Sequence, residues 1–418
     1  MTTISHPDLV RFVYETGSPF RRLEALLSDI EPAQGLPPIT MTVGAPRHAP
    51  PLGLTDAVVS SMSGFGQYPA ITGTDAHRGA IGHWINRRYG LDPKSMEHGY
   101  AILPLNGSRE GLVLAARCAR DRSDKRKDGG RRVGERPVIV MQNPFYQAYV
   151  AGALAADCEV VLLDEHDLTG ASLDISVWSR TVAAYIASPT NPQGAVLSVE
   201  DWQAWIERAR EHDFMLFADE CYSEIYRFSP PPGALEAAAQ TTGGFGHVVA
   251  FNSLSKRSNL PGLRSGFVAG DPAFLADFMK LRNMGGPQVP LPVQAASNLA
   301  WADEAHVKES RALYTEKWAL VDAKLGQWLS EATPPAGFFL WLKLPEGVSD
   351  IDAAKTLWRT YALRTIPGSF MAYPTDEGPT AADRLRLALV DDEPTTLEAL
   401  DRLSRFFDTV APVKAMAD

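Results

Sequence analysis

A single lysine stands among hydroxyl residues in the stretch FNSLSKRSNLPGLRSGF, which covers residues 251–267. The pattern is neither helix-periodic nor that of a simple strand, so it predicts a loop held for chemistry. A buried lysine with a lowered pKa can form a Schiff base with an aldehyde, although a surface position is the commoner fate of a lysine. The hydroxyls of Ser253 and Ser255 and the guanidinium of Arg264 can bind a phosphate group. Together with Lys256 they indicate the cofactor pyridoxal phosphate.

This cofactor imposes further requirements that other motifs meet. Its pyridine nitrogen withdraws electrons when protonated, so a carboxylate must face it. Asp219, at the end of FMLFADECY, can favour the protonated form. The phenolic oxygen of the ring needs hydrogen-bond donors, for which Tyr222 and Asn191, in SPTNPQG, are suitable. Tyr146, in NPFYQAY, can stack on the face of the ring.

The phosphate and the substrate also need specific donors. In LNGSREGLVLAARCAR, the residues Gly107, Ser108 and Arg109 precede an apolar helical pattern, so their N–H groups can bind a phosphate at the helix start. A helix cap explains a Gly-Ser pair equally well. An amino acid substrate carries an α-carboxylate, which an arginine must receive. Arg386, in RLRLALV, is our candidate, and Arg384 is its competitor because strand alternation puts both on one face.

Short apolar runs lead to most of these residues and are typical of buried strands. The runs cover residues 136–144, 158–164, 181–194, 214–222, 247–256 and 265–271. Helical patterns such as residues 198–212 separate them, which predicts an α/β fold with a mostly parallel sheet and helices on both faces. Ligands bind such sheets at the carboxyl ends of the strands. The residues expected at those ends are Asn143, Asn191, Asp219, Tyr222, Ser253 and Lys256.

The C-terminal part has a different pattern, which predicts a second, smaller α+β lobe. The expected elements are a long helical pattern over 290–331, strands at 334–345 and 384–390, and a closing helix at 395–409. We expect residues 45–288 to form a large cofactor-binding domain. The small domain, with an N-terminal arm, then comprises residues 1–44 and 289–418.

The composition argues against several classes of protein. The chain has 418 residues and is 45% hydrophobic, which is enough to fill two lobes. Its net charge of −10 argues against nucleic-acid binding, and we expect the basic run at 120–136 to be a solvated surface loop. Cysteine and histidine spacings predict neither a disulfide framework nor a metal site. No secretory signal or membrane span is visible, so we expect a soluble cytoplasmic protein.

Taken together, the motifs resemble those of the class I/II aminotransferases, pyridoxal-phosphate enzymes of fold type I. The resemblance covers nearly the whole chain and includes NGSREGL, NPFYQAY, SPTNPQG, ADECYSEIY, SLSKRSNLPGLRSGF, GFFLWL and RLRLALV in the family's order. It implies that Lys256 binds the cofactor and transfers protons, with Asp219 and Tyr222 beside it in catalysis. It implies the phosphate, ring and carboxylate roles described above for the remaining residues.

Two further residues come from the resemblance alone. Tyr68, in QYPAITG, matches a family tyrosine that reaches the phosphate of the neighbouring subunit, so the resemblance implies a homodimer. Gly44, in TVGAPRH, matches a loop glycine whose backbone faces the substrate, and Asn191 and Arg386 are implied to bind the substrate with it.

Within the family, SLSKRSNLPGLRSGFVAGD and GAPRH are most similar to bacterial succinyldiaminopimelate transaminases of the lysine and cell-wall pathway. This implies amino transfer between glutamate and the keto acid that corresponds to N-succinyl-LL-2,6-diaminopimelate. Its far carboxylate would need a cation, for which Arg47, His48, Arg109 and Arg257 are candidates. Specificity for aspartate, an aromatic amino acid or LL-diaminopimelate stays open, as do a pyridoxal-phosphate lyase and a non-enzymatic regulator on the same fold.

Overall fold

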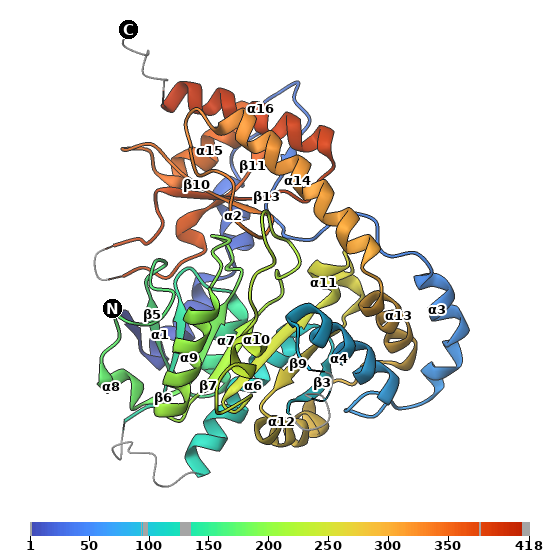
Figure 1. Cartoon of the computed structure of the whole chain (residues 1–418). Coiled ribbons are helices and arrows are strands. Elements are labelled where there is room, and N and C mark those ends of the chain that lie inside the picture. Colours follow the sequence, from blue (N-terminus) through green and yellow to red (C-terminus); the bar gives the residue numbers. More distant parts are fainter. Residues whose placement is uncertain (1, 93, 95–98, 126–134, 376–377, 412–418) are drawn as a thin grey trace.

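The computed structural model describes residues 2–92, 94, 99–125, 135–375 and 378–411 (Figure 1). Residues 120–125 of the predicted basic surface loop are helical, so that part of the prediction is wrong, and residues 126–134 lie outside the described residues. Within the described part of the chain, none of the helices combines the length and the apolar character needed to cross a membrane. The cytoplasmic location stays a prediction.

A mixed, mostly parallel sheet forms the larger part of the molecule, and the predicted fold class is confirmed. In sequence order its described strands are β1 (Thr2–Ile4), β3 (Ala101–Leu105), β4 (Val138–Gln142), β5 (Glu159–Leu163), β6 (Thr181–Ala187), β7 (Met215–Asp219), β8 (Val248–Ser253) and β9 (Gly266–Gly270). Their order across the sheet is β1-β5-β4-β6-β7-β8-β9-β3. The neighbours from β5 to β8 pair in parallel, whereas β1 and β9 run antiparallel to their neighbours.

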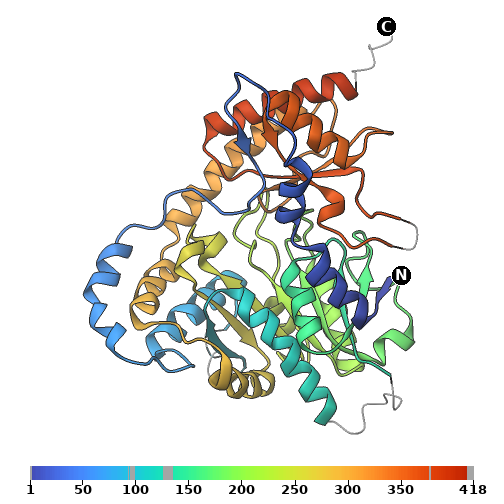
Figure 2. The ribbon, with the colours of Figure 1, turned by 180° about the vertical axis from the view of Figure 1, so that it is seen from behind.

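Both faces of this sheet are apolar, which explains the continuous apolar runs in the sequence. In β4, alternation directs Val138 and Val140 into one core and Ile139 and Met141 into the other. The first core is closed by α4 (Asp75–Tyr89), α9 (Val199–Glu211), α10 (Ala234–Ala239) and α13 (Leu291–Ala302). The second is closed by α1 (His6–Arg11), α6 (Ser108–Lys125), α7 (Gln147–Ala155) and α12 (Pro272–Gly285). Figures 1 and 2 show these two layers from opposite sides.

A smaller antiparallel sheet lies apart from the large one (Figure 1). It consists of β10 (Phe339–Lys343), β13 (Arg384–Ala388) and β12 (Ile366–Pro367) in that order, and β2 (Ile39–Thr40) pairs separately with β11 (Leu363–Arg364). The helices here are α2 (Pro19–Leu27), α14 (Ala305–Leu325), α15 (Asp350–Tyr361) and α16 (Glu393–Val410). The remaining described elements are η1 (Phe12–Thr16), α3 (Leu54–Ser60), η2 (Met62–Gly66), α8 (Ile175–Trp178), α11 (Leu254–Arg257), η3 (Pro261–Leu263) and η4 (Gly368–Phe370).

Two elements bear on the predicted division into domains. The long helical pattern at 290–331 is broken into α13 and α14, because α13 packs against α3 and α4 whereas α14 packs against α16. At the N-terminus, β1 pairs with β5 of the large sheet. The division stays a proposal, and we assign β1 and α13 to the lobe of the large sheet.

The carboxyl ends of the parallel strands meet at one edge of the large sheet. Asp219 ends β7, Asn191 follows β6 and Lys256 follows β8. Since β4 has β5 on one side and β6 on the other, the crossovers change direction beside β4, which is where such sheets bind ligands.

Candidate active site

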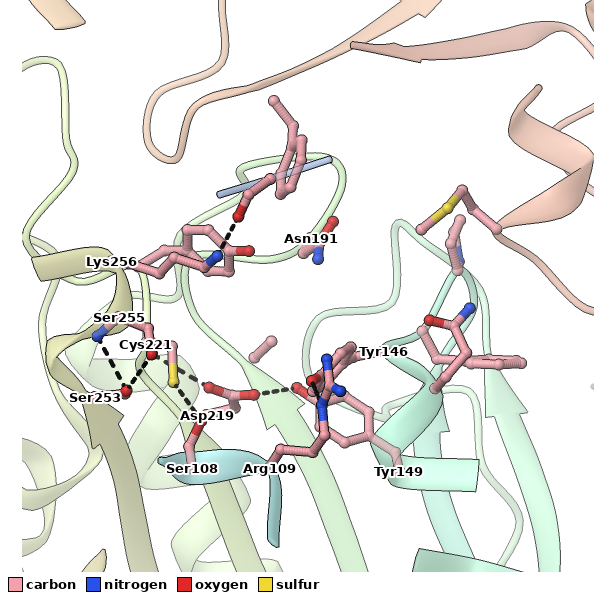
Figure 3. A pocket seen from close by; sticks show the side chains of 18 of the residues that line it. Ser108, Arg109, Tyr146, Tyr149, Asn191, Asp219, Cys221, Ser253, Ser255 and Lys256 are labelled. Atoms are coloured by element: carbon pink, nitrogen blue, oxygen red, sulfur yellow. Dashed lines mark hydrogen bonds between the residues drawn. The ribbon is translucent and has the colours of Figure 1, made fainter. Parts of the chain in front are cut away.

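A cavity of about 500 Å³ opens at this edge, between the large sheet and the small one (Figure 3). Its walls combine the ends of β7 and β8 with Phe339 of β10 and Arg386 of β13. Most residues predicted from the sequence line it: Gly44, Ser108, Arg109, Tyr146, Asn191, Asp219, Tyr222, Ser253, Ser255, Lys256, Arg264 and Arg386. Neither of the other two lines the cavity: the Gly107 backbone lies against the guanidinium of Arg264, and Tyr68 is outside the cavity. Among the described residues, no group of His, Cys, Asp and Glu side chains could hold a metal ion.

Lys256 lies in the short helix α11, not in the loop that the sequence predicted. The hydroxyl of Ser253 accepts the N–H of Ser255 at 3.1 Å and caps this single turn, and the left-handed backbone of Asn259 follows its end. The Lys256 amine donates to the carbonyl of Gly44. Burial lowers the pKa of Lys256 to about 8, so about a tenth of the amine is neutral at pH 7, far more than for an ordinary lysine.

Asp219 forms the buried floor of the cavity. Burial raises the pKa of its carboxyl, while hydrogen bonds to the carboxylate oppose that shift. The donors are the backbone N–H of Cys221 at 3.2 Å and the hydroxyl of Tyr149 at 2.7 Å (Figure 3). These bonds keep a carboxylate available to face a cationic group.

Hydroxyl, guanidinium and helix-terminal groups gather on one side of the cavity. The hydroxyls of Ser253 and Ser255 lie 2.8 Å apart, and Ser108 begins the 18-residue helix α6. Gly107 has φ of +80°, and a Cβ there would overlap the guanidinium of Arg264. The close approach explains the glycine and leaves a concave set of donors suited to a phosphate.

Arg386 is the buried cation on the small-sheet side. Only 3% exposed, it donates to the Thr42 carbonyl at 2.7 Å and to Asn191 Oδ1 at 3.5 Å. Burial lowers its pKa to about 10, and its Nε is a buried donor without a partner. Its competitor Arg384 pairs with Glu165 at 3.5 Å and does not line the cavity.

Only one of the four cations suggested for a far carboxylate lines the cavity. Arg109 does so, and its Nε donates to the Tyr146 hydroxyl at 2.6 Å. Arg47 pairs with Asp391, and His48 is bonded to Ser310 and Lys317 at 2.9 Å each. Arg257 is buried and bonded to Glu304 at 2.6 Å. The structure does not bring these last three to the cavity, because their polar groups bind other parts of the protein.

The geometry agrees with the comparison to known protein families. The model of the family described as aminotransferase class I and II matches residues 37–403. The chain belongs to the class I and II aminotransferases. It is a pyridoxal-phosphate-dependent transaminase, which decides against the lyase and the regulator left open by the sequence.

Relatives of this aminotransferase match along most of its length. A solved structure of an aminotransferase from Neisseria meningitidis is 35% identical, with a TM-score of 0.85 and coverage of 95% of this chain and 99% of that chain. The 4-dedimethylamino-4-oxo-anhydrotetracycline transaminase OxyQ of Streptomyces rimosus is 31% identical over 80% of this chain and 84% of its own. An LL-diaminopimelate aminotransferase of Desulforudis audaxviator is 28% identical over 92% of this chain and 94% of its own.

The residues of this aminotransferase fit pyridoxal phosphate. One cavity contains an amine for the aldehyde, at Lys256, and a buried carboxylate for the ring nitrogen, at Asp219. It also contains hydrogen-bond donors for the phosphate. The Gly107 backbone is one part of this set, and a Cβ at that position would occupy the space between it and Arg264. The three groups lie at the end of β7, in α11 directly after β8 and at the start of α6, so the sheet and not a single motif brings them together.

Sequence reasoning missed two residues that contact Asp219 in the aminotransferase. Tyr149 stacks on Tyr185 with ring centroids 4.6 Å apart and donates its hydroxyl to Asp219. Its signal was its position three residues after Tyr146 in NPFYQAY, which places both at the start of α7. Cys221, the residue after Glu220, donates its backbone N–H to Asp219 and its thiol to Ser108 at 3.1 Å.

We predict that Tyr149→Phe lowers kcat about 5- to 10-fold and weakens cofactor binding. Removing the hydroxyl takes away a donor that favours the Asp219 carboxylate, so the pKa of Asp219 rises further. Steady-state kinetics and cofactor titration measure both effects. The matched control is Tyr185→Phe. Tyr185 stacks on Tyr149, but its hydroxyl donates to the Leu112 carbonyl at 2.6 Å and not to Asp219. Equal losses in the two variants would contradict a specific effect on Asp219.

Proposed function

We propose that the enzyme transfers an amino group between glutamate and the keto acid that corresponds to N-succinyl-LL-2,6-diaminopimelate. The observation that supports an α-amino acid substrate is the buried Arg386. Its Nε has no hydrogen-bond partner, and its side chain lines the same cavity as Lys256. A carboxylate is the group that completes such a guanidinium. The finer assignment rests on the motifs SLSKRSNLPGLRSGFVAGD and GAPRH.

In this proposal, the predicted residues bind the cofactor and move a proton. Pyridoxal phosphate, when bound, supplies an aldehyde and an electron-withdrawing ring. Lys256 holds the cofactor and moves a proton to and from the substrate α-carbon, for which a pKa of about 8 is suited. Asp219 faces the ring nitrogen, and Tyr146 covers the ring. The ring oxygen is bound by Asn191 and Tyr222, and the phosphate by Gly107, Ser108, Arg109, Ser253, Ser255 and Arg264.

The substrate side of the cavity has one more cation available. Arg109 is held against Tyr146 and lines the wall, so its free N–H groups can receive a far carboxylate as well as contribute a backbone N–H to the phosphate. Apolar side chains, including Phe20 and Met371, line the same cavity and suit an aliphatic chain between two carboxylates.

LL-Diaminopimelate is the second candidate. A relative that covers 92% of this chain is an LL-diaminopimelate aminotransferase, although it is only 28% identical. That substrate carries an ammonium group and a carboxylate at its far end, whereas the succinylated one carries a neutral amide and two carboxylates there. The two candidates therefore differ in the charge that the far wall must accept.

The substrate is tested by a spectral titration of the cofactor-loaded protein. We predict that glutamate bleaches the cofactor band and that N-succinyl-2-amino-6-ketopimelate restores it, whereas oxaloacetate does not.

Arg109→Gln should lower kcat/KM for the succinylated substrate about 10-fold or more, since it removes a charged hydrogen bond. Arg47→Gln, whose parent side chain pairs with Asp391, is the control and should leave it unchanged. Recovery with other keto acids alone would refute the substrate but not the class.

The lowered pKa of Lys256 predicts how the apoprotein captures its cofactor. Only the neutral amine attacks an aldehyde, so the capture rate should rise about tenfold per pH unit below pH 8 and level off above it. Rapid-mixing absorbance with pyridoxal phosphate measures this rate, and Lys256→Ala should give no covalent product after borohydride reduction. A midpoint near the ordinary lysine value of 10.5 would contradict a buried amine.

We also propose that the active enzyme is a homodimer. Tyr68 is 99% exposed and outside its own chain's cavity, and Arg264 lies at the exposed edge of the phosphate donors. Nearby in sequence, Leu52, Val59 and Phe65 are also exposed. Sedimentation should give an active species of two chains, and Tyr68→Phe should weaken cofactor binding about 5-fold through one lost hydrogen bond. A fully active monomer would refute the dimer.

A further inference from the structure

The strands β7 and β8 stop pairing just before the turns that follow them. The ladder between these strands ends at Asp219 and Phe251, with one more bond of 2.9 Å from the Glu220 N–H to the Phe251 carbonyl. Beyond it, β8 continues along β9 only, where Asn252 faces Phe267. The backbone of the sheet therefore does not join the Asp219–Tyr222 turn to the Ser253–Lys256 turn.

The side chain of Asn252 makes this connection. Its Nδ2 donates to the Glu220 carbonyl at 3.0 Å and to the Ser223 hydroxyl at 3.1 Å. Its Oδ1 accepts the N–H of Ser253 at 2.7 Å. One amide thus holds the turn after β7 with its nitrogen and the turn after β8 with its oxygen.

This asparagine is not part of the cavity wall. It is 2% exposed and does not line the cavity, so neither cofactor nor substrate is its partner. The Glu220 carbonyl also accepts the Ser223 N–H at 3.0 Å, which uses its second lone pair. By contrast Asn86, a buried asparagine of α4, leaves its Nδ2 without a partner. In the Asn252 amide, by comparison, both the nitrogen and the oxygen have hydrogen-bond partners.

We propose that Asn252 is a positioning residue that sets the separation between the Asp219 carboxylate and the Lys256 amine. The inference rests on the roles proposed for these two residues. Lys256 follows the anchored Ser253 by three positions in a single capped turn, and Asp219 directly precedes the anchored Glu220. A shift of either turn moves one reacting group relative to the other.

The test compares Asn252→Ala and Asn252→Asp in the cofactor-loaded enzyme. Asn252→Asp keeps the volume and the acceptor for Ser253 but loses the donor to Glu220. Both variants should lower kcat about 10- to 100-fold, because a displacement of about 1 Å is enough for that loss. The KM for glutamate should change less than about 3-fold. The cofactor Kd should rise and the visible circular dichroism of the bound cofactor should fall, since its orientation is no longer fixed.

Two further variants separate positioning from folding. Asn86→Ala removes a buried asparagine that accepts the Tyr100 hydroxyl, and it should leave kcat, Kd and dichroism unchanged. Ser223→Ala removes only one acceptor of Asn252 and should lower kcat about 3-fold, so it remains informative where an Asn252 variant does not fold.

The outcomes are distinct for the two proposals. Variants of Asn252 that lose thermal stability but keep the wild-type dichroism, Kd and kcat would overturn the positioning role. All readouts use glutamate or the cofactor, so failure of the succinylated substrate leaves this inference standing. A wild-type protein in which Lys256 does not bind the cofactor would overturn both.

Discussion

Removal of ionisable groups from water at one edge of a parallel sheet is the constraint on which the site depends. Burial is the main influence on three of its groups, lowering the pKa of Lys256 and of Arg386 and raising that of Asp219. Each shift favours the neutral form of the group. Such groups are tolerated because each has a hydrogen-bond partner: the carbonyls of Gly44 and Thr42 accept from Lys256 and Arg386, and the Tyr149 hydroxyl donates to Asp219.

The layered architecture explains how this edge can be buried. Apolar side chains on both faces of the large sheet bring helices to each side, so the strand ends lie in the interior and not on a surface. The small sheet then closes the remaining side through Phe339 and Arg386. Residues far apart in sequence meet there without a long loop to carry them.

Much of this arrangement could be predicted from the sequence because its signals are local. Apolar runs ending in polar residues indicated the strands and the edge at which ligands gather, and the placement of Asp219 and Lys256 followed from them. The choice of Arg386 over Arg384 was weaker, since alternation gives both the same face. In the structure Arg384 pairs with Glu165, which follows β5, and does not line the cavity.

Other features depend on contacts between distant segments, which a local pattern does not contain. His48 and Arg47 look like free cations in the sequence, but they bind Lys317 and Asp391 from the C-terminal part of the chain. The break between α13 and α14 depends on which helices each packs against. Tyr149 contacts Asp219 from the helix after β4, whereas Asp219 ends β7, so NPFYQAY shows a second tyrosine but not the residue that it contacts.

The cavity is lined by residues from both lobes of the chain. Asp219 ends β7 of the large sheet and Lys256 lies in α11 directly after β8, whereas Arg386 and Phe339 are on the small sheet and Phe20 is on α2. Substitutions of the apolar residues Phe339 and Phe20 can change which substrate side chains the cavity accepts while Lys256 and Asp219 keep their surroundings. Such a division allows relatives to keep one reaction while their substrate specificity diverges, as the relatives named for a tetracycline intermediate and for LL-diaminopimelate illustrate.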